Sequence, residues 1–387
     1  MGFLDSRSQS LPRSWRVGLP VAMGLLFCLL YGLNLASGPA PDGAAFLEMA
    51  KSGHWMHAQH LITGLPLYGL LLAFPHQDPV VVSGLLSAAS GGLAVGSLCR
   101  LGLGMGLGRV GATLGAALVG LSQGWWTHGT AYEVHILAVG VTLLAAALAV
   151  TGRRHLRLGL LLAMAILCHK TMVLAVPALV LTSLVGSKRP GLAALRTLAV
   201  LTLILGAAYG LAATSQLDTG RTLEQIGREL ALGELRDGAD RPLNDQIPMR
   251  ARHALAYTVA WLPDNGQARQ VLTWVVPGLL VLFSLLGSAL HWRLRPQHRH
   301  ALLLWLWPLL ALPAIWFFEA GNFEYYLGPV ALLILLGCSA LPERFSWVLL
   351  LPIAALGVQR FPAEAPLEQR HEVQPRREGP ARNPSTR

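Results

Sequence analysis

Residues 17–36 read VGLPVAMGLLFCLLYGLNLA and contain no charged side chain. A helix of about 20 apolar residues crosses the roughly 30 Å of hydrocarbon in a bilayer. Arg7, Arg13 and Arg16 precede the run, and the small residues 36–38 follow it, as they do in a cleaved signal peptide. The apolar core of a signal peptide is shorter, about 7–15 residues. We therefore interpret this stretch as the first membrane-spanning helix.

Similar apolar stretches recur along nearly the whole chain of 387 residues, which is 53% hydrophobic and 13% charged, with a mean hydropathy of +0.50. Soluble domains carry about 25% charged residues, so the composition indicates a membrane protein. The fold class we predict is all-α, a polytopic integral membrane helix bundle of about 10–12 transmembrane segments. The expected spans are 17–36, 80–98, 109–126, 135–151, 156–168, 171–186, 193–213, 268–291, 300–318, 325–341 and 345–359.

The apolar segment 61–74 is too short to be a confident crossing, and it contains Gly64 and Pro66. About 14 residues at 1.5 Å each extend only about 21 Å. We assume that this segment does not cross and that the N-terminus is cytoplasmic. The short outer loops then hold only Lys51 and Lys170, and the other basic residues near helix ends lie inside. This distribution is the one that the positive-inside rule expects. The inner residues are then Arg7, Arg13, Arg16, Arg100, Arg109, Arg153, Arg154, Arg157, Lys188, Arg189, Arg196, Arg293, Arg295, Arg299 and Arg344.

The formal net charge of +10 therefore reflects membrane topology. No basic stretch is interleaved with aromatic residues as single-stranded nucleic-acid binding requires, and we expect no nucleic-acid partner. The cysteines lack CxxC spacing and indicate neither a zinc site nor a redox pair; they are Cys28, Cys99, Cys168 and Cys338. Motifs for nucleotide hydrolysis, dinucleotide binding, zinc proteolysis and serine hydrolysis are also absent from the sequence. No ligand spacing along the chain indicates a metal or another cofactor.

The chain divides into four regions. Residues 1–213 form an N-terminal membrane module with its first external loop at 37–60, residues 214–267 an external loop, residues 268–359 the C-terminal transmembrane helices, and residues 360–387 a disordered tail rich in Pro, Arg and Glu. Within about 215–253, a capping-box spacing from Thr222 to Gln225 precedes an apolar face of Leu223, Ile226 and Leu230. This pattern fits an amphipathic helix on the membrane surface and equally a solvated loop helix.

Four clusters of polar residues fall on the predicted outer face, and each has a plainer interpretation. An ionised Asp42 is able to act as a general base, or it is a loop carboxylate in water. Glu133 lies where a helix enters the bilayer, and an ionisable group there is costly unless it is paired or functional. The aromatic residues near it also fit an ordinary interfacial belt. Lys170 supplies positive charge to a lipid phosphate, or its side chain simply extends to the headgroups by snorkelling. The candidate substrate-binding residues are His57, His60, Glu133, His135, His169, Lys170, Glu319 and Glu324.

Three motifs in residues 15–185 resemble the polytopic GT-C superfamily of membrane glycosyltransferases, especially its bacterial protein O-mannosyltransferase-like branch. Residues 42–46 (DGAAF) with 64–68 (GLPLY) resemble the acidic first loop and the GYPLY segment of that branch. Residues 122–126 (SQGWW) leading to 133–137 (EVHIL) resemble its W-S-Q … E-V-Y-x-L stretch, and residues 159–177 resemble its G-L-x-x-x-H-x-T-M helix pair. The His-Pro-Pro of that branch is absent, and the acidic loop has one aspartate.

The resemblance implies a GT-C-like first external loop and transfer of a sugar from a polyprenyl-phosphate carrier. Asp42 would be the general base, and the anomeric configuration would invert. His169, Lys170, His57 or His60 would supply positive charge for the leaving phosphate, and Glu133 would shape the sugar or acceptor pocket. The acceptor would be a protein, lipid or glycan on the periplasmic side of a bacterial inner membrane.

Two other functions remain open. A flippase for lipids or oligosaccharides also has many helices, but its ionisable groups usually lie near the midplane of repeated, broken helices. The helix centres here are nearly free of charge, and no second half of the sequence matches the first. The missing His-Pro-Pro also leaves a catalytically inactive scaffold of the same fold as an alternative.

Overall fold

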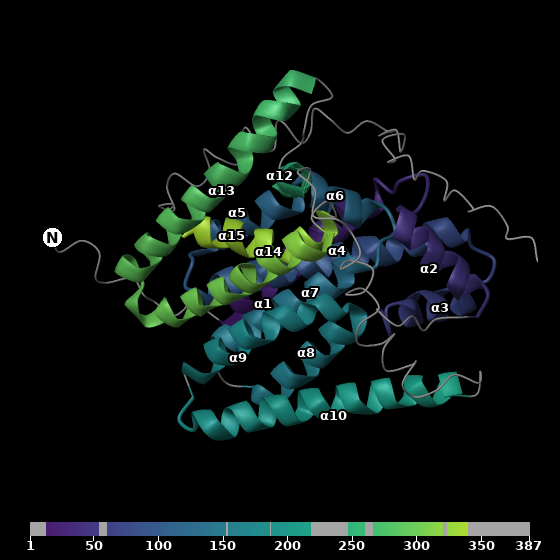
Figure 1. Ribbon diagram of the computed structural model, residues 1–387, viewed down its shortest axis with the longest axis horizontal. Helices are drawn as coiled ribbons and strands as arrows, with labels where there is room; N and C mark the ends of the chain where they lie inside the picture. The colour runs from purple at the N-terminus through teal and green to yellow at the C-terminus, as the bar shows by residue number, and fades with distance from the viewer. Residues whose placement is uncertain are drawn as a thin grey trace, which may run out of the picture.

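The computed structural model describes residues 13–53, 60–151, 154–185, 187–217, 247–259, 266–319 and 323–339, and within these residues every regular element is helical. The predicted all-α fold class is confirmed. Figure 1 shows the helices packed around α4 and α7, with the long helix α10 along one side of the bundle. The first elements are α1 (Arg13–Gly32), α2 (Pro41–Lys51), α3 (Gly64–Ala73), α4 (Pro79–Gly104), α5 (Arg109–Gly120), α6 (Gln123–Thr130), α7 (His135–Thr151) and α8 (His155–Cys168).

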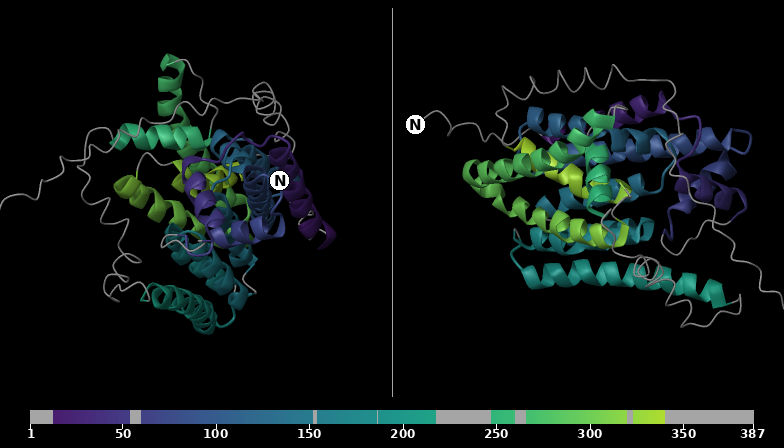
Figure 2. Two further views of the ribbon diagram at one scale, coloured as in Figure 1. Left: turned by 90° about the vertical axis from the view of Figure 1, so that its right-hand side faces the viewer. Right: turned by 45° about the horizontal axis from the view of Figure 1, so that its top comes forward.

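From Lys170 onward the chain contains several 3₁₀ segments next to α-helices, where one span was expected from the sequence. Its elements are η1 (Lys170–Ala175), α9 (Val176–Val185), α10 (Pro190–Leu217), α12 (Ile247–Val259), α13 (Gly266–Leu294), η2 (Pro296–Trp305), α14 (Leu306–Glu319), η3 (Phe323–Tyr326) and α15 (Leu327–Cys338). Figure 2 shows α13 diverging from the bundle on the side away from α10.

Four of the described helices are long and apolar enough to cross a membrane: Ser14–Gly32, Pro79–Gly104, Pro190–Thr214 and Gln270–Leu294. Taken together, the helices α6 and α7 are also long and apolar enough to cross a membrane, although they bend by 115° at their break. The other predicted spans correspond to shorter apolar helices or, at 345–359, lie outside the described residues. Large apolar side chains cover the outward faces of α1, α10 and α13, including Leu25, Leu203 and Leu279. Such surfaces suit lipid rather than water, and the protein is a multi-pass membrane protein.

The prediction of one span at 109–126 is wrong. The helix α5 ends at Gly120, and a new helix begins at Gln123 after Ser122 adopts an extended conformation (φ −68°, ψ 152°). The Tyr31 hydroxyl donates to the carbonyl oxygen of Gly120 over 2.7 Å and satisfies a backbone acceptor freed at that end. The stretch therefore forms two separate helices, α5 and α6.

The described helices place two sets of loops at opposite ends of the bundle. At one end, the guanidinium of Arg109 stacks over Trp15 at 4.3 Å, and the ring of His300 lies 3.0 Å from the carbonyl oxygen of Val150. This end also carries a basic cavity of about 280 Å³ next to Lys188 and Arg189. Among the described residues, Arg109, Lys188 and Arg189, which the charge pattern placed inside, lie at this end.

The opposite end begins with the loop after α1. The backbone amide of Ala36 donates to Thr130, that of Ala40 to Tyr132 and that of Ile62 to Leu167. The helices α2 and α3 pack together and against the start of α4 at this end, as Figure 1 shows. Helix α3 has ten residues and returns the chain to the same end, so 61–74 does not cross the bundle.

The sequence did not predict two described elements. Helix α2 lies inside the expected polar loop at 37–60, and α12 begins near the end of the polar segment 215–253. The proposed amphipathic face at Leu223, Ile226 and Leu230 lies outside the described residues, as does the tail from residue 360. The boundaries of the four predicted regions stay predictions.

Candidate functional site

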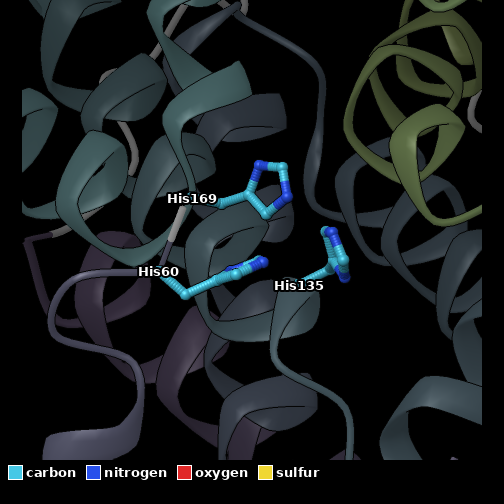
Figure 3. Close-up of side chains that lie close together, drawn as sticks. All are labelled: His60, His135 and His169. Carbon is cyan, nitrogen blue, oxygen red and sulfur yellow. The ribbon is translucent and has the colours of Figure 1, made fainter. Parts of the chain in front are cut away.

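Three histidines from separate breaks between helices meet at the end of the bundle that carries α2 and α3. His60 precedes α3, His135 begins α7, and His169 lies between α8 and η1. Their ring centroids lie 4.2–5.4 Å apart, and Figure 3 shows the three rings around a common centre. The exposed fractions are 5% for His60, 2% for His135 and 0% for His169. We call these residues the histidine cluster.

Each ring of the histidine cluster is oriented through its Nδ1 atom. The Nδ1 of His60 lies 3.1 Å from the carbonyl oxygen of Cys168, and the Nδ1 of His135 lies 3.2 Å from Oε1 of Glu133. The backbone amide of Thr171 donates to the Nδ1 of His169 over 3.2 Å, and its hydroxyl lies 2.5 Å from the same atom.

Glu133 lies two residues before His135 in the chain, and it is buried. Its Oε1 accepts the backbone amide of Val134 over 2.8 Å, and its own amide donates to the hydroxyl of Ser87 on α4 over 3.0 Å. A buried carboxylate is tolerated when it is paired and hydrogen-bonded. Ser87 therefore fixes the α6–α7 break to α4, and the break presents both Glu133 and His135 to the cluster.

The fourth predicted polar region also reaches the cluster, through an aromatic ring rather than a carboxylate. Tyr325 in η3 lies with its ring 5.4 Å from the rings of both His135 and His169. The structure describes the backbone of Glu319 and Glu324 but not their side chains, so their predicted roles stay untested. His57 lies outside the described residues.

Burial changes the protonation of His169, which lies outside both neighbouring helices. Desolvation, followed by the nearby His135, His60 and Lys170, holds the pKa of His169 well below its usual range. The imidazole is therefore neutral at pH 7. Within the described residues its Nε2 is fully buried without a hydrogen-bond partner. Lys170, half-buried at the start of η1, is a better source of positive charge than His169.

Asp42 has a different environment from the histidines, because it lies in the first turn of α2 and is exposed. Its helix packs closely on the segment that leads to Glu133: the carbonyl oxygen of Tyr132 contacts Gly43 and accepts the amide of Ala40 over 3.1 Å. Three residues further along α2, the ring of Phe46 lies 5.0 Å from that of His60. The predicted base and the predicted binding residues thus belong to one packed unit.

The sequence identified the histidines and Glu133 but not the residues that orient them. Thr63 donates to the carbonyl oxygen of Cys168 over 2.6 Å and shares this acceptor with His60. Of these contacts, only the Thr171 contact has a local sequence signal, because a side chain two residues before a helical amide commonly caps a helix start. The Ser87 and Cys168 contacts join segments far apart in the chain.

No protein-family model matches the sequence, and no curated protein matches it. A search of solved structures finds ArnT from Cupriavidus metallidurans bound to undecaprenyl phosphate, with a TM-score of 0.59 and 16% sequence identity. The match covers 89% of this chain and 64% of the ArnT chain, so this chain spans less than two thirds of that protein. The similarity is one of fold. The chain has a GT-C-like polytopic membrane fold, as the three motifs predicted.

Proposed function

We propose that this protein is a membrane glycosyltransferase that takes a sugar from a polyprenyl-phosphate carrier and transfers it to an acceptor hydroxyl. The observation that carries the proposal is the convergence of the predicted polar clusters at one end of a GT-C-like fold. Asp42, Glu133, His135, His169 and the ring of Tyr325 belong to that end. In the proposed topology it faces the periplasm of a bacterial inner membrane.

The proposed reaction is a single displacement. Asp42 removes the proton of the acceptor hydroxyl, the acceptor oxygen attacks the anomeric carbon, and the bond from that carbon to the phosphate oxygen breaks. The configuration inverts, and polyprenyl phosphate leaves. An exposed Asp42 suits this role because an ionised carboxylate near the acceptor is ready to take a proton, and the first turn of α2 also favours its negative charge.

The leaving phosphate needs a positive charge or strong hydrogen-bond donors. Lys170 is the cation that we assign to it, because burial keeps His169 neutral. Glu133 shapes the sugar or acceptor pocket through the α6–α7 break rather than acting as a base, since its Oε1 is engaged by the Val134 amide and the His135 ring. The neighbour ArnT was crystallised with undecaprenyl phosphate, which supports a carrier of that class.

The test uses purified full-length protein in liposomes with a panel of polyprenyl-phosphate sugars, and it measures release of polyprenyl phosphate and labelling of acceptors. Asp42→Asn should lower the rate by about 10²–10⁴-fold, the usual contribution of a general base. Glu48→Gln is the matched control, because Glu48 is an exposed carboxylate on the same helix that pairs with Lys51 over 2.7 Å. It should keep the wild-type rate.

Equal rates for Asp42→Asn and the wild type would remove Asp42 from the role of base. A wild-type protein that turns over no carrier in the panel would favour the inactive scaffold.

A flippase is the second candidate, and the 115° bend between α6 and α7 favours it, since transporters place ionisable groups at broken helices. Glu133 and His135 do lie at such a break. They lie at the end of the bundle that carries α2 and α3, however, whereas transporter sites lie near the midplane. Movement of a fluorescent carrier lipid between leaflets, without cleavage of its phosphate–sugar bond, would identify this activity.

A further inference from the structure

The histidine cluster has an electronic property that the proposed sugar transfer does not use. Carbonyl and carboxylate oxygens only accept hydrogen bonds. The contacts with Cys168 and Glu133 therefore require a proton on the Nδ1 atoms of His60 and His135. In a neutral imidazole the other nitrogen then carries a lone pair. His60 and His135 thus present two Nε2 lone pairs at the buried centre.

The candidate ligand atoms of His60, His135 and His169 all lie within 4.8 Å of one another. A Zn²⁺ ion bound at about 2.0–2.1 Å from each nitrogen needs pairs about 3.4 Å apart in tetrahedral geometry. Separations of up to 4.8 Å are longer than this value, so binding requires the three side chains to close on the ion.

The neighbours of the rings match those of histidine ligands in metal sites. Metal-bound histidines donate their second N–H to a carboxylate or a backbone carbonyl. His135 has the carboxylate of Glu133 as this partner, and His60 has the backbone carbonyl of Cys168. These partners fix the tautomer in which Nε2 is the ligand.

His169 requires one proton shift before it binds a metal. The Thr171 amide now donates to its Nδ1, so the proton lies on the buried Nε2, which makes no hydrogen bond within the described residues. In the other tautomer the Nδ1–H donates to the Thr171 hydroxyl, already 2.5 Å away, and Nε2 is free to bind. The shift moves one proton within the ring and releases none, but it gives up the Thr171 amide bond.

We propose that His60, His135 and His169 bind one divalent transition-metal ion of the Zn²⁺ class through their Nε2 atoms. Imidazole ligands suit zinc and its neighbours, whereas Mg²⁺ and Ca²⁺ prefer oxygen. Three protein ligands leave a fourth position for water or a substrate oxygen. The ion joins the segment before α3, the α6–α7 break and the α8–η1 break. This site departs from the expectation, drawn from spacing along the chain alone, that no metal is held, and it does not depend on the proposed sugar transfer.

The test uses tag-free full-length protein in detergent, stripped with dipicolinate and then given one equivalent of Zn²⁺ or Co²⁺. Metal content by mass spectrometry should approach one ion per chain after desalting, and zinc should raise Tm. The Co²⁺ protein should show the intense visible absorption of a four-coordinate site. His135→Asn and His169→Asn should lose bound metal, and Glu133→Gln should raise Kd by about 10–100-fold, as changes of such partners do.

His128→Asn is the matched control, because His128 is a buried histidine on α6 outside the cluster; it should still bind one ion. The Co²⁺ spectrum of the wild-type protein tests the proposal even if a cluster variant fails to fold. Metal content no higher than that of a detergent blank, a weak octahedral Co²⁺ spectrum, or undiminished binding in both well-folded cluster variants would overturn the metal site. None of these measurements uses a sugar donor, so they are independent of the test of the proposed function.

Discussion

At the scale of single residues, the candidate site depends on four buried side chains, those of His60, Glu133, His135 and His169. Glu133 was selected because an ionisable group where a helix enters the bilayer is costly without a role, and the three histidines because they fall in the predicted outer-face clusters. The structure brings all four together. Their burial and tautomers were not predictable, because these depend on Cys168 and on other segments remote in the chain. Periodicity does not report such contacts.

The opposite end of the bundle gives a prediction about pH at the same scale. Burial, followed by His300 and Arg295, lowers the pKa of His298, which lies in η2 over Gly106. A histidine whose pKa is lower in the folded than in the unfolded state binds fewer protons when folded. Stability is therefore retained above the unfolded value of about 6.5 and is lost as the pH falls below it.

His298→Asn should reduce this pH dependence. We expect the drop in Tm between pH 7.5 and pH 5.5, measured in detergent, to be smaller in the variant than in the wild type. The matched control is His76→Asn, an exposed histidine in the turn before α4, which should keep the full drop. An equal drop in all three proteins would show that His298 does not contribute.

At the scale of elements, the long apolar helices were predictable and the interruptions were not. The spans at 17–36, 193–213 and 268–291 became α1, α10 and α13, because hydropathy over about 20 residues is a strong signal. The stretch 109–126 is also largely apolar, but it breaks between Gly120 and Gln123. A break of this kind depends on a tertiary partner, here Tyr31, rather than on local composition.

Helix α2 provides the sharpest test at this scale. A Cβ atom at position 43 would collide with the backbone carbonyl of Tyr132, and a backbone atom cannot move aside as a side chain end does. Gly43→Ala should therefore push α2, with Asp42, away from the segment that carries Glu133. We expect transfer activity to fall by at least about 10-fold, since misplacing a catalytic group by about 1 Å costs up to 10²-fold.

Gly69→Ala in the adjacent helix α3 is the control for this change. Nothing lies within 4 Å of the added Cβ there, and alanine is favoured over glycine inside a helix by about 0.5–1 kcal/mol. Activity should be unchanged and Tm equal or slightly higher. Comparable losses from both substitutions would mean that the contact between Gly43 and Tyr132 does not position the site.

At the scale of the whole molecule, the distribution of charge and the fold support the same two-ended arrangement. The sequence assigned basic loops to one side and the acidic and histidine clusters to the other, using only the positive-inside rule. The structure separates the basic cavity near Lys188 from the histidine cluster by the length of α8, whose 14 residues extend about 21 Å. The membrane orientation of the two ends is the remaining prediction.

Single cysteines test this orientation in intact cells, in a background where the four native cysteines are replaced by alanine. Ser52→Cys at the end of α2 and Lys188→Cys beside the basic cavity are suitable because both positions are exposed. We expect a membrane-impermeant maleimide to label position 52 in intact cells and position 188 only after permeabilisation. Positions 133 and 169 are unsuitable because both are buried. If the maleimide labels position 188 but not position 52 in intact cells, the protein has the opposite orientation in the membrane. The histidine cluster and Asp42 would then face the cytoplasm, and an acceptor on the periplasmic side would be excluded.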